Sequence, residues 1–125
     1  YQIFPDRFCN SGRNCGDKYK PWASANKKVS NADSYGGDLQ GVISKLDYLK
    51  ELGVTTIYLN PISLANSSHK YDTSDYMKID DMFGTESEFK KLVNLAKAYG
   101  INIVIDGVYN HTGSDSIYFN KKYIR

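Results

Sequence analysis

LQGVISKLDYLKELGVTTIYLN, the stretch at residues 39–60, holds the pattern that decides the fold. Apolar side chains recur at steps of three and four along residues 39–52, which predicts an amphipathic helix with Asp38 as its N-cap. Gly53 ends this helix, and a run rich in β-branched residues follows it directly. Because the run does not alternate with polar residues, it is typical of a strand buried on both faces of a parallel sheet.

The same arrangement occurs again toward the end of the chain. Thr85 and Glu88 have the spacing of a capping box, an apolar stripe continues to Tyr99, and Gly100 precedes the apolar run INIVI at residues 101–105. YQIF at residues 1–4 predicts one more strand. The predicted order is therefore strand, helix, strand, helix, strand.

The connections between these elements are unequal in length. Each helix is joined to the next strand by about one glycine, whereas residues 5–37 and 60–84 connect strands to helices. In parallel α/β proteins the loops at the carboxyl ends of strands build the ligand site. A doubly wound sheet is one closure of such a pattern, but the glycine-rich phosphate turn of nucleotide-binding sheets is not found after any predicted strand. The pattern favours an α/β fold that is part of a (β/α)₈ TIM barrel, with strands 1–3 and helices 1–2.

Composition excludes several classes of function. The net charge is +2, from 16 basic and 14 acidic residues, so no electrostatic footprint for nucleic acid is present. No apolar run approaches the ~20 residues of a membrane-spanning helix. Cys9 and Cys15 leave a short disulfide loop and two free thiols as open alternatives. Since the sequence opens inside a predicted strand without Met, we expect it to be part of a larger protein.

Two loops carry candidate chemistry. Asp106 follows a buried strand directly, and Asn110 and His111 lie within the same six residues, DGVYNH. A carboxylate at such a strand end needs a partner, which is either functional or that of an ordinary Asp-Gly turn. The loop SSHKYDTSDYMKID contains His69 and Tyr71. Aromatic faces and imidazoles suit a sugar, although a loop held by its own hydrogen bonds has a similar composition.

The first loop is rich in oxygen ligands. Asn10, Asp17 and Asp38, with backbone carbonyls near Gly36, have the chemistry of a calcium site. Asp38 is also explained as a helix cap, and asparagine and glycine are common in loops. Spacing alone leaves both explanations open.

Four segments in order carry a resemblance to a known family. YQIFPDRF, YGGDLQGVISKLDYLKELGVTTIYLNPI, HKYDTSDYMKID and IVIDGVYNH are similar to the α-amylase family of glycoside hydrolases (family 13), with the nearest likeness to its neopullulanase and cyclomaltodextrinase branch. The resemblance implies that residues 1–125 are the N-terminal part of a catalytic (β/α)₈ barrel. The segment would end at the start of the insertion that the family carries after strand three.

The resemblance also implies roles for single residues. Asp106 would hold the active-site network together, and Asn110, which matches a calcium-binding position of many amylases, would support the same site. His111 would donate or accept a hydrogen bond with the sugar beside the cleaved linkage. Tyr71 would stack on that sugar, and His69 would lie next to Tyr71. In the neopullulanase-like branch, calcium would be held near the first loop. The residues carried over to that site are Asn10, Asp17, Gly36 and Asp38.

The function implied is that of a fragment of a retaining hydrolase acting on α-1,4 linkages, with α-1,6 linkages open, in starch-like or cyclic maltooligosaccharides. Retaining glycosidases need two carboxyl groups roughly 5–5.5 Å apart, and the family takes these from strands beyond residue 125. We therefore expect the fragment alone to be inactive. The alternative is a non-catalytic amylase-like binding or interaction module. For the parent protein, a cytoplasmic location is favoured and a homodimer stays open.

Overall fold

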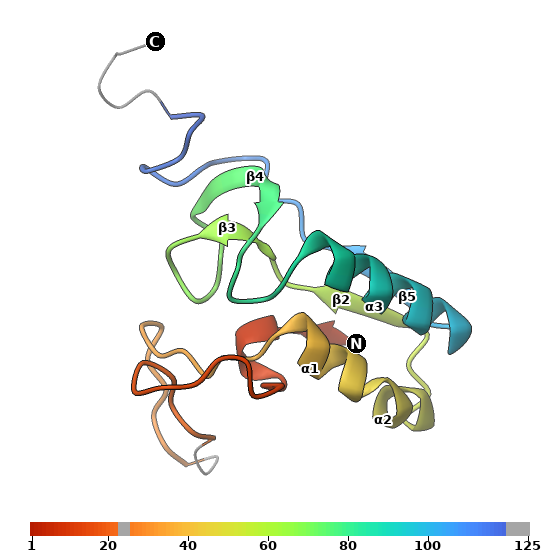
Figure 1. The fold of residues 1–125 in the computed structure, drawn as a ribbon. Coiled ribbons are helices and arrows are strands. Elements are labelled where there is room, and N and C mark those ends of the chain that lie inside the picture. Colours follow the sequence, from red (N-terminus) through yellow and green to blue (C-terminus); the bar gives the residue numbers. More distant parts are fainter. Residues whose placement is uncertain (23–25, 120–125) are drawn as a thin grey trace.

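A computed structural model describes residues 1–22 and 26–119, and its centre is a small parallel sheet (Figure 1). The strands are β1 (Gln2–Ile3), β2 (Thr56–Leu59) and β5 (Asn102–Ile105), in the order β1-β2-β5. Both pairings are parallel, with Ile3 opposite Leu59 and Leu59 opposite Ile105. The carboxyl ends of all three strands therefore lie at one edge, as the sequence predicted.

Helices cover one face of this sheet. They are α1 (Leu39–Ser44), α2 (Leu46–Glu51) and α3 (Glu86–Ala98), and a 3₁₀ turn, η1 (Pro5–Arg7), follows β1. Side chains pointing from the strands toward the helices build the core, in which Leu39, Leu49, Ile57, Leu59 and Leu92 are fully buried. Asp38 caps α1 through the Gly41 N–H, and the capping box at the start of α3 is present.

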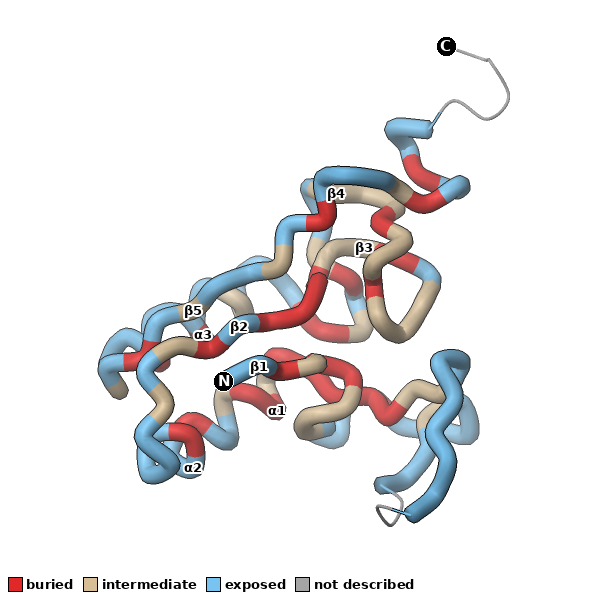
Figure 2. The backbone as a smooth tube through the Cα atoms, turned by 180° about the vertical axis from the view of Figure 1, so that it is seen from behind, coloured by how far each residue is buried: buried red, intermediate tan, exposed pale blue. Residues whose placement is uncertain are grey.

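The other face of the sheet is open, which corrects the expectation of strands buried on both faces. Figure 2 shows the sheet from behind, where most of β5 is exposed, and β2 is exposed at Tyr58. Tyr58 and Val104, which are opposite each other in the register, are 37% and 43% exposed. The apolar runs thus match a sheet with two covered faces, but the described residues supply helices for only one of them.

The helix predicted at residues 39–52 is divided in two. Lys45, with φ −109° and ψ 9°, separates α1 from α2. The Ser44 hydroxyl donates to the Gly41 carbonyl at 2.7 Å. The Lys45 N–H donates to Val42 O at 3.0 Å, and not to Gly41 O as it would in a continuous α-helix. A serine that bonds back to its own helix in this way competes with the backbone and tightens the turn.

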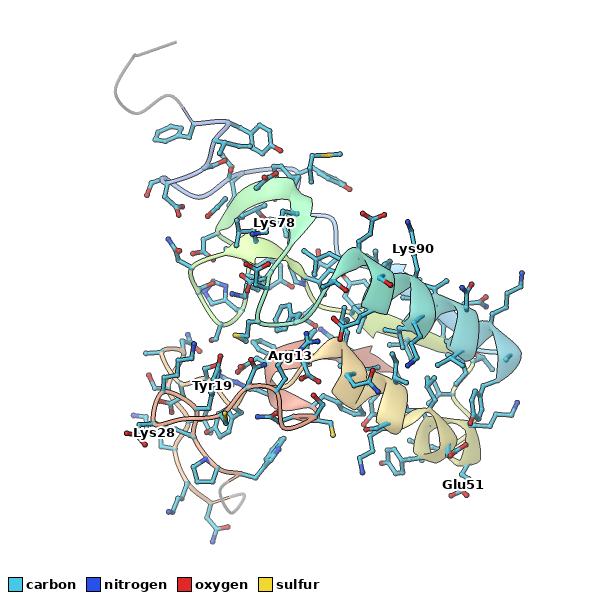
Figure 3. All side chains as sticks on the ribbon, in the orientation of Figure 1. Arg13, Tyr19, Lys28, Glu51, Lys78 and Lys90 are labelled. Carbon is cyan, nitrogen blue, oxygen red and sulfur yellow. The ribbon has the colours of Figure 1, made fainter. Side chains whose placement is uncertain are left out.

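The second long connection is not a simple loop. It contains an antiparallel hairpin of β3 (Ser63–Ala65) and β4 (Thr73–Ile79), with register shifts on both sides of Leu64. Charged side chains such as Lys78 on β4 and Lys90 on α3 lie at the periphery (Figure 3). None of the helices in residues 1–22 and 26–119 has the length and apolar character needed to cross a bilayer.

Candidate functional site

Asp106 is the centre of a polar cluster at the carboxyl ends of the strands. The Tyr71 hydroxyl donates to Asp106 Oδ2 at 2.7 Å. This hydrogen bond, helped by burial, raises the pKa of Tyr71 to about 12, because ionisation would place a phenolate against a carboxylate. The Asp106 carboxylate also raises the pKa of Tyr58, for the same reason. The predicted partner of Asp106 is therefore present, and it comes from the hairpin connection.

Two further polar residues extend this cluster toward β1. Gln2 Nε2 donates to Asn60 Oδ1 at 2.7 Å, and Asn60 Nδ2 lies 3.4 Å from the Tyr71 hydroxyl. Asn60 directly follows β2 and is buried. Sequence analysis missed Gln2, Tyr58 and Asn60. The available signal for Asn60 was the one used for Asp106, a polar residue placed where a buried strand ends.

His69 is held in a defined tautomer by the turn that it occupies. The backbone N–H of Tyr71 donates to His69 Nδ1 at 3.1 Å, so in the neutral ring Nδ1 is the acceptor and Nε2 carries the proton. The Ser67 hydroxyl also lies 3.1 Å from Nδ1, and it donates to Asp72. The His69 and Tyr71 rings are 5.9 Å apart and tilted by 31°. The turn therefore leaves the His69 Nε2–H as a donor for a ligand.

His111 is held in the same Nε2–H tautomer, but the nitrogen that it leaves for a ligand is Nδ1. Its Nε2 lies 2.8 Å from the carbonyl oxygen of Tyr71, which accepts only, so Nε2 donates and Nδ1 of the neutral ring keeps its lone pair. The side chain is exposed. His69 and His111 thus offer one donor and one acceptor on either side of Tyr71. A ligand rich in hydroxyl groups, which both donate and accept, can use both rings.

The structure thus brings together four of the five predicted site residues at the strand ends, namely His69, Tyr71, Asp106 and His111. Asn110 is exposed, and no hydrogen bond of its side chain occurs within the described part of the chain. Its supporting role stays a prediction.

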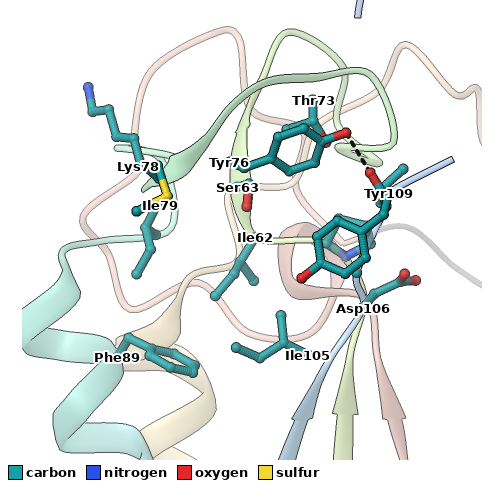
Figure 4. A pocket seen from close by; sticks show the side chains of 14 residues that line it. Ile62, Ser63, Thr73, Tyr76, Lys78, Ile79, Phe89, Ile105, Asp106 and Tyr109 are labelled. Carbon is teal, nitrogen blue, oxygen red and sulfur yellow. Dashed lines mark hydrogen bonds between the residues drawn. The ribbon is translucent and has the colours of Figure 1, made fainter. Parts of the chain in front are cut away.

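A cavity of about 290 Å³ lies beside this cluster (Figure 4). Tyr76 and Tyr109 flank it with ring centroids 5.9 Å apart, and Ile62, Ile105 and Phe89 supply apolar lining. The Tyr76 hydroxyl is 2.6 Å from the carbonyl oxygens of Val108 and His111, which fixes the backbone after β5. Asp106 is the one residue that lines the cavity and belongs to the polar cluster. Because hydroxyl recognition needs the polar groups, we place the candidate site at the cluster.

The predicted calcium ligands are only partly assembled. Asn10 and Gly36 are in close contact, since a Cβ atom on Gly36 would lie 2.6 Å from Asn10 Nδ2, and Asp38 follows Gly36 closely in the chain. Asp17 is exposed, and its carboxylate has no hydrogen bond or ion pair among the residues described. No group of three or more His, Cys, Asp or Glu side chains suited to a metal occurs in residues 1–22 and 26–119.

The oxygen atoms of this loop already have hydrogen-bond donors. The contacts are Gly12 N–H to Asn10 Oδ1 at 2.8 Å, Asn14 Nδ2 to Gly36 O at 2.9 Å, and Gly41 N–H and Ser11 Oγ to the Asp38 carboxylate at 2.7 and 2.5 Å. Calcium takes ~6–8 oxygen ligands, so it would have to displace several of these donors. In this arrangement the loop does not fit the ion, and calcium binding stays a prediction.

Parallel strands with sugar-compatible polar side chains at their carboxyl edge fit the layout of a (β/α)₈ glycosidase barrel. The family model "Alpha amylase, catalytic domain" matches residues 2–124. The chain belongs to the α-amylase family of glycoside hydrolases, as a part of the catalytic domain, and the predicted partial (β/α)₈ barrel is confirmed.

Individual relatives agree with this assignment. The chain is 48% identical to an amylopullulanase of Thermoanaerobacterium saccharolyticum, over 97% of this chain and 11% of the relative. It is also 48% identical to a cyclomaltodextrinase of Thermoanaerobacter pseudethanolicus, over 95% of this chain and 20% of the relative. A cyclic α-maltosyl-(1→6)-maltose hydrolase from Arthrobacter globiformis superposes with a TM-score of 0.84 at 41% identity, over 95% of this chain and 26% of that structure. The chain thus spans about a tenth to a fifth of the length of these curated relatives.

Proposed function

We propose that this chain is the sugar-binding part of a retaining hydrolase of α-glucans. The substrates would be starch-like or cyclic maltooligosaccharides, cleaved at α-1,4 linkages, with α-1,6 linkages included where the rest of the domain permits. The observation that carries the proposal is the cluster in which Tyr71 donates to Asp106 while His69 and His111 present complementary groups. The names of the relatives, which include amylopullulanase and cyclomaltodextrinase, support this substrate class.

Each side chain has a distinct task in this proposal. The Tyr71 ring covers the apolar face of one glucose unit, as aromatic rings do with sugars. The His69 Nε2–H donates to a hydroxyl of that unit, and His111 Nδ1 accepts from another. Asp106 fixes the Tyr71 ring and can pair with a cationic group from the remainder of the barrel. The nucleophile and the acid come from strands outside residues 1–125, so that the complete domain forms and hydrolyses a covalent glycosyl-enzyme.

The test is hydrolysis by a complete catalytic domain that contains this chain. We expect reducing sugar to be released from β-cyclodextrin, starch or pullulan, and none by the 125-residue chain alone. Tyr71→Phe should lower kcat/KM about tenfold, because the ring loses its fixed orientation. Tyr99→Phe is the matched control, since its hydroxyl also donates to an aspartate, Asp47, but on an exposed helix surface. It should leave kcat/KM unchanged.

Two results would contradict the proposal. A complete domain that degrades none of these glucans is not such a hydrolase. If calorimetry detects binding of maltoheptaose and no hydrolysis follows, the alternative is favoured, a non-catalytic amylase-like binding module.

Location and assembly complete the proposal. Cys9 and Cys15 are free thiols. Free thiols persist in reducing compartments, which supports a cytoplasmic location. A homodimer of the parent protein would be tested by its mass in solution.

A further inference from the structure

Lys70 stands between two residues of the proposed sugar site, and its backbone is unusual. Its φ angle is 63°, and no other non-glycine residue within the described ranges has a positive φ. Left-handed backbone is unfavourable for residues with a Cβ atom, and lysine lacks the short polar side chain that helps asparagine or aspartate there. Contacts elsewhere in the molecule therefore have to hold Lys70 in this conformation.

The buried ammonium group of Lys70 provides those contacts. The residue is 4% exposed, and Nζ donates to Ala65 O at 2.8 Å and to Asp80 Oδ2 at 2.7 Å. The ring of Phe83 adds a cation–π contact at 5.6 Å. Because a buried ammonium without partners is strongly unfavourable, Lys70 has few alternative positions. The buried side chain thus fixes the backbone conformation of Lys70.

Asp80 connects this anchor to both strands of the hairpin. Its Oδ2 also accepts from the Ala65 N–H at 3.2 Å, where β3 ends, and its Oδ1 accepts from the Met82 N–H at 3.0 Å, after β4. The Asp80 N–H donates to Ile62 O at 2.9 Å. Asp80 is 7% exposed. Lys70 is therefore tied, through Asp80, to the ends of both strands of the hairpin.

The turn at Lys70 determines how its two neighbours point. The Lys70 N–H donates to Ser67 Oγ at 3.0 Å, and the next N–H, that of Tyr71, donates to His69 Nδ1 at 3.1 Å. With Lys70 in an extended conformation, the Tyr71 N–H would turn away from the His69 ring. The Tyr71 hydroxyl would then also lose its direction toward Asp106.

We propose that Lys70 is a positioning residue for sugar binding. Its buried ammonium, held by Asp80 and Ala65, maintains the left-handed turn that keeps His69 in its Nε2–H form and directs Tyr71 to Asp106. Lys70 is buried and acts only through these neighbours. The proposal rests on the proposed function, because it assumes that His69 and Tyr71 bind the substrate.

Lys70→Met tests this role, since methionine keeps much of the length of the side chain and removes the charge. In the complete domain we expect KM for maltoheptaose to rise about tenfold or more, with a smaller change in kcat. Lys90→Met is the matched control, because Lys90 is an exposed lysine on α3 that pairs with the exposed Glu86 (Figure 3). It should change neither constant.

Nuclear magnetic resonance separates positioning from simple stabilisation. In the complete domain, ¹⁵N shifts of the His69 ring should show the Nε2–H tautomer, and Lys70→Met should give a mixture of tautomers. The Tyr71 signal should titrate earlier in the variant, because the contact with Asp106 is lost. Should Lys70→Met fail to fold, the pair Lys70→Met/Asp80→Asn carries the same measurements, since it leaves no unpaired charge and keeps an acceptor for Ala65.

The proposal on Lys70 is overturned if a folded variant keeps the KM, the tautomer and the Tyr71 titration of the wild type and only melts at a lower temperature. If the wild-type domain does not cleave α-glucans, it is the proposed function that fails. The magnetic resonance measurements still decide, in that case, whether Lys70 holds the turn.

Discussion

The two long connections at the carboxyl edge of the sheet are both fixed by buried charges, but by different means. In the first, residues 5–37, Asp6 is 0% exposed and accepts from the N–H groups of Tyr35 and Gly36 and from the Ser34 hydroxyl. In the second, residues 60–84, the buried charge is an ion pair of Lys70 and Asp80. Asp6 therefore holds the first connection by its backbone N–H groups, whereas the second connection is held by the side chain of Lys70.

This difference explains why only the second connection supplies site residues. Asp6 accepts from the backbone at Tyr35 and Gly36 and from the Ser34 hydroxyl, and the Tyr35 side chain is buried. Lys70 is drawn inward alone, so the residues on either side of it, His69 and Tyr71, turn toward the strand ends. Burial of one side chain can thus present two others, provided that the buried one is firmly paired.

The largest effect is expected from removing the charge that holds the first connection. Asp6→Ala leaves the N–H groups of Tyr35 and Gly36 without their acceptor, and we expect a loss of about 3 kcal/mol in the free energy of unfolding, measured by urea titration. Asp81→Ala, at an exposed carboxylate, should stay within about 0.5 kcal/mol of the wild type. If Asp6→Ala lowers the free energy of unfolding as little as Asp81→Ala does, the Asp6 carboxylate does not hold the first connection, because water can replace it.

The second prediction concerns the hydrogen bond from Tyr71 to Asp106 in the candidate site. The pKa of Tyr71 is raised to about 12, so at about pH 11 most of the phenol is still protonated, whereas an ordinary tyrosine with a pKa of about 10 is mostly ionised. The folded pKa lies above the unfolded one. The stabilisation is therefore fully present below about pH 10 and is lost as the pH rises toward 12. Asp106→Asn should return the titration toward pH 10.

The measurement is a pH titration of ¹³Cζ-labelled tyrosine, with Tyr71→Phe used to assign the signal. A tyrosine in an unfolded peptide serves as the reference. A Tyr71 signal that ionises together with the reference would show that the contact with Asp106 does not form in solution.

The features that sequence predicted here are those set by local chemistry. The Asp38 cap, the capping box of Thr85 and Glu88 and the glycine stops depend on residues a few positions apart, and all are present. Asp106 was found because a carboxylate at a strand end needs a partner.

The features that sequence missed depend on contacts between distant residues. Nothing local indicates that Asp6 bonds residues 34–36, or that Lys70 is buried against Asp80, since lysine is ordinarily exposed. The hairpin was missed for a related reason. Its strand β3 is short, the register is irregular, and β4 carries polar residues on both faces, so no alternation marks it. The residue types of the site could be predicted, but not the contacts that aim them.

The smallest effect is expected from calcium, which would bind in the first connection. Because hydrogen-bond donors already occupy the oxygens of Asn10, Gly36 and Asp38, any binding should be weak. A site with millimolar affinity stabilises by about 0.4 kcal/mol at 1 mM calcium. We therefore expect nearly equal melting temperatures with 1 mM calcium and with EGTA, and the same result with magnesium as a control. A large shift specific to calcium would mean that the loop rearranges around an ion. The first connection would then be held by an ion as well as by Asp6, and its difference from the Lys70 connection would be smaller than the hydrogen bonds indicate.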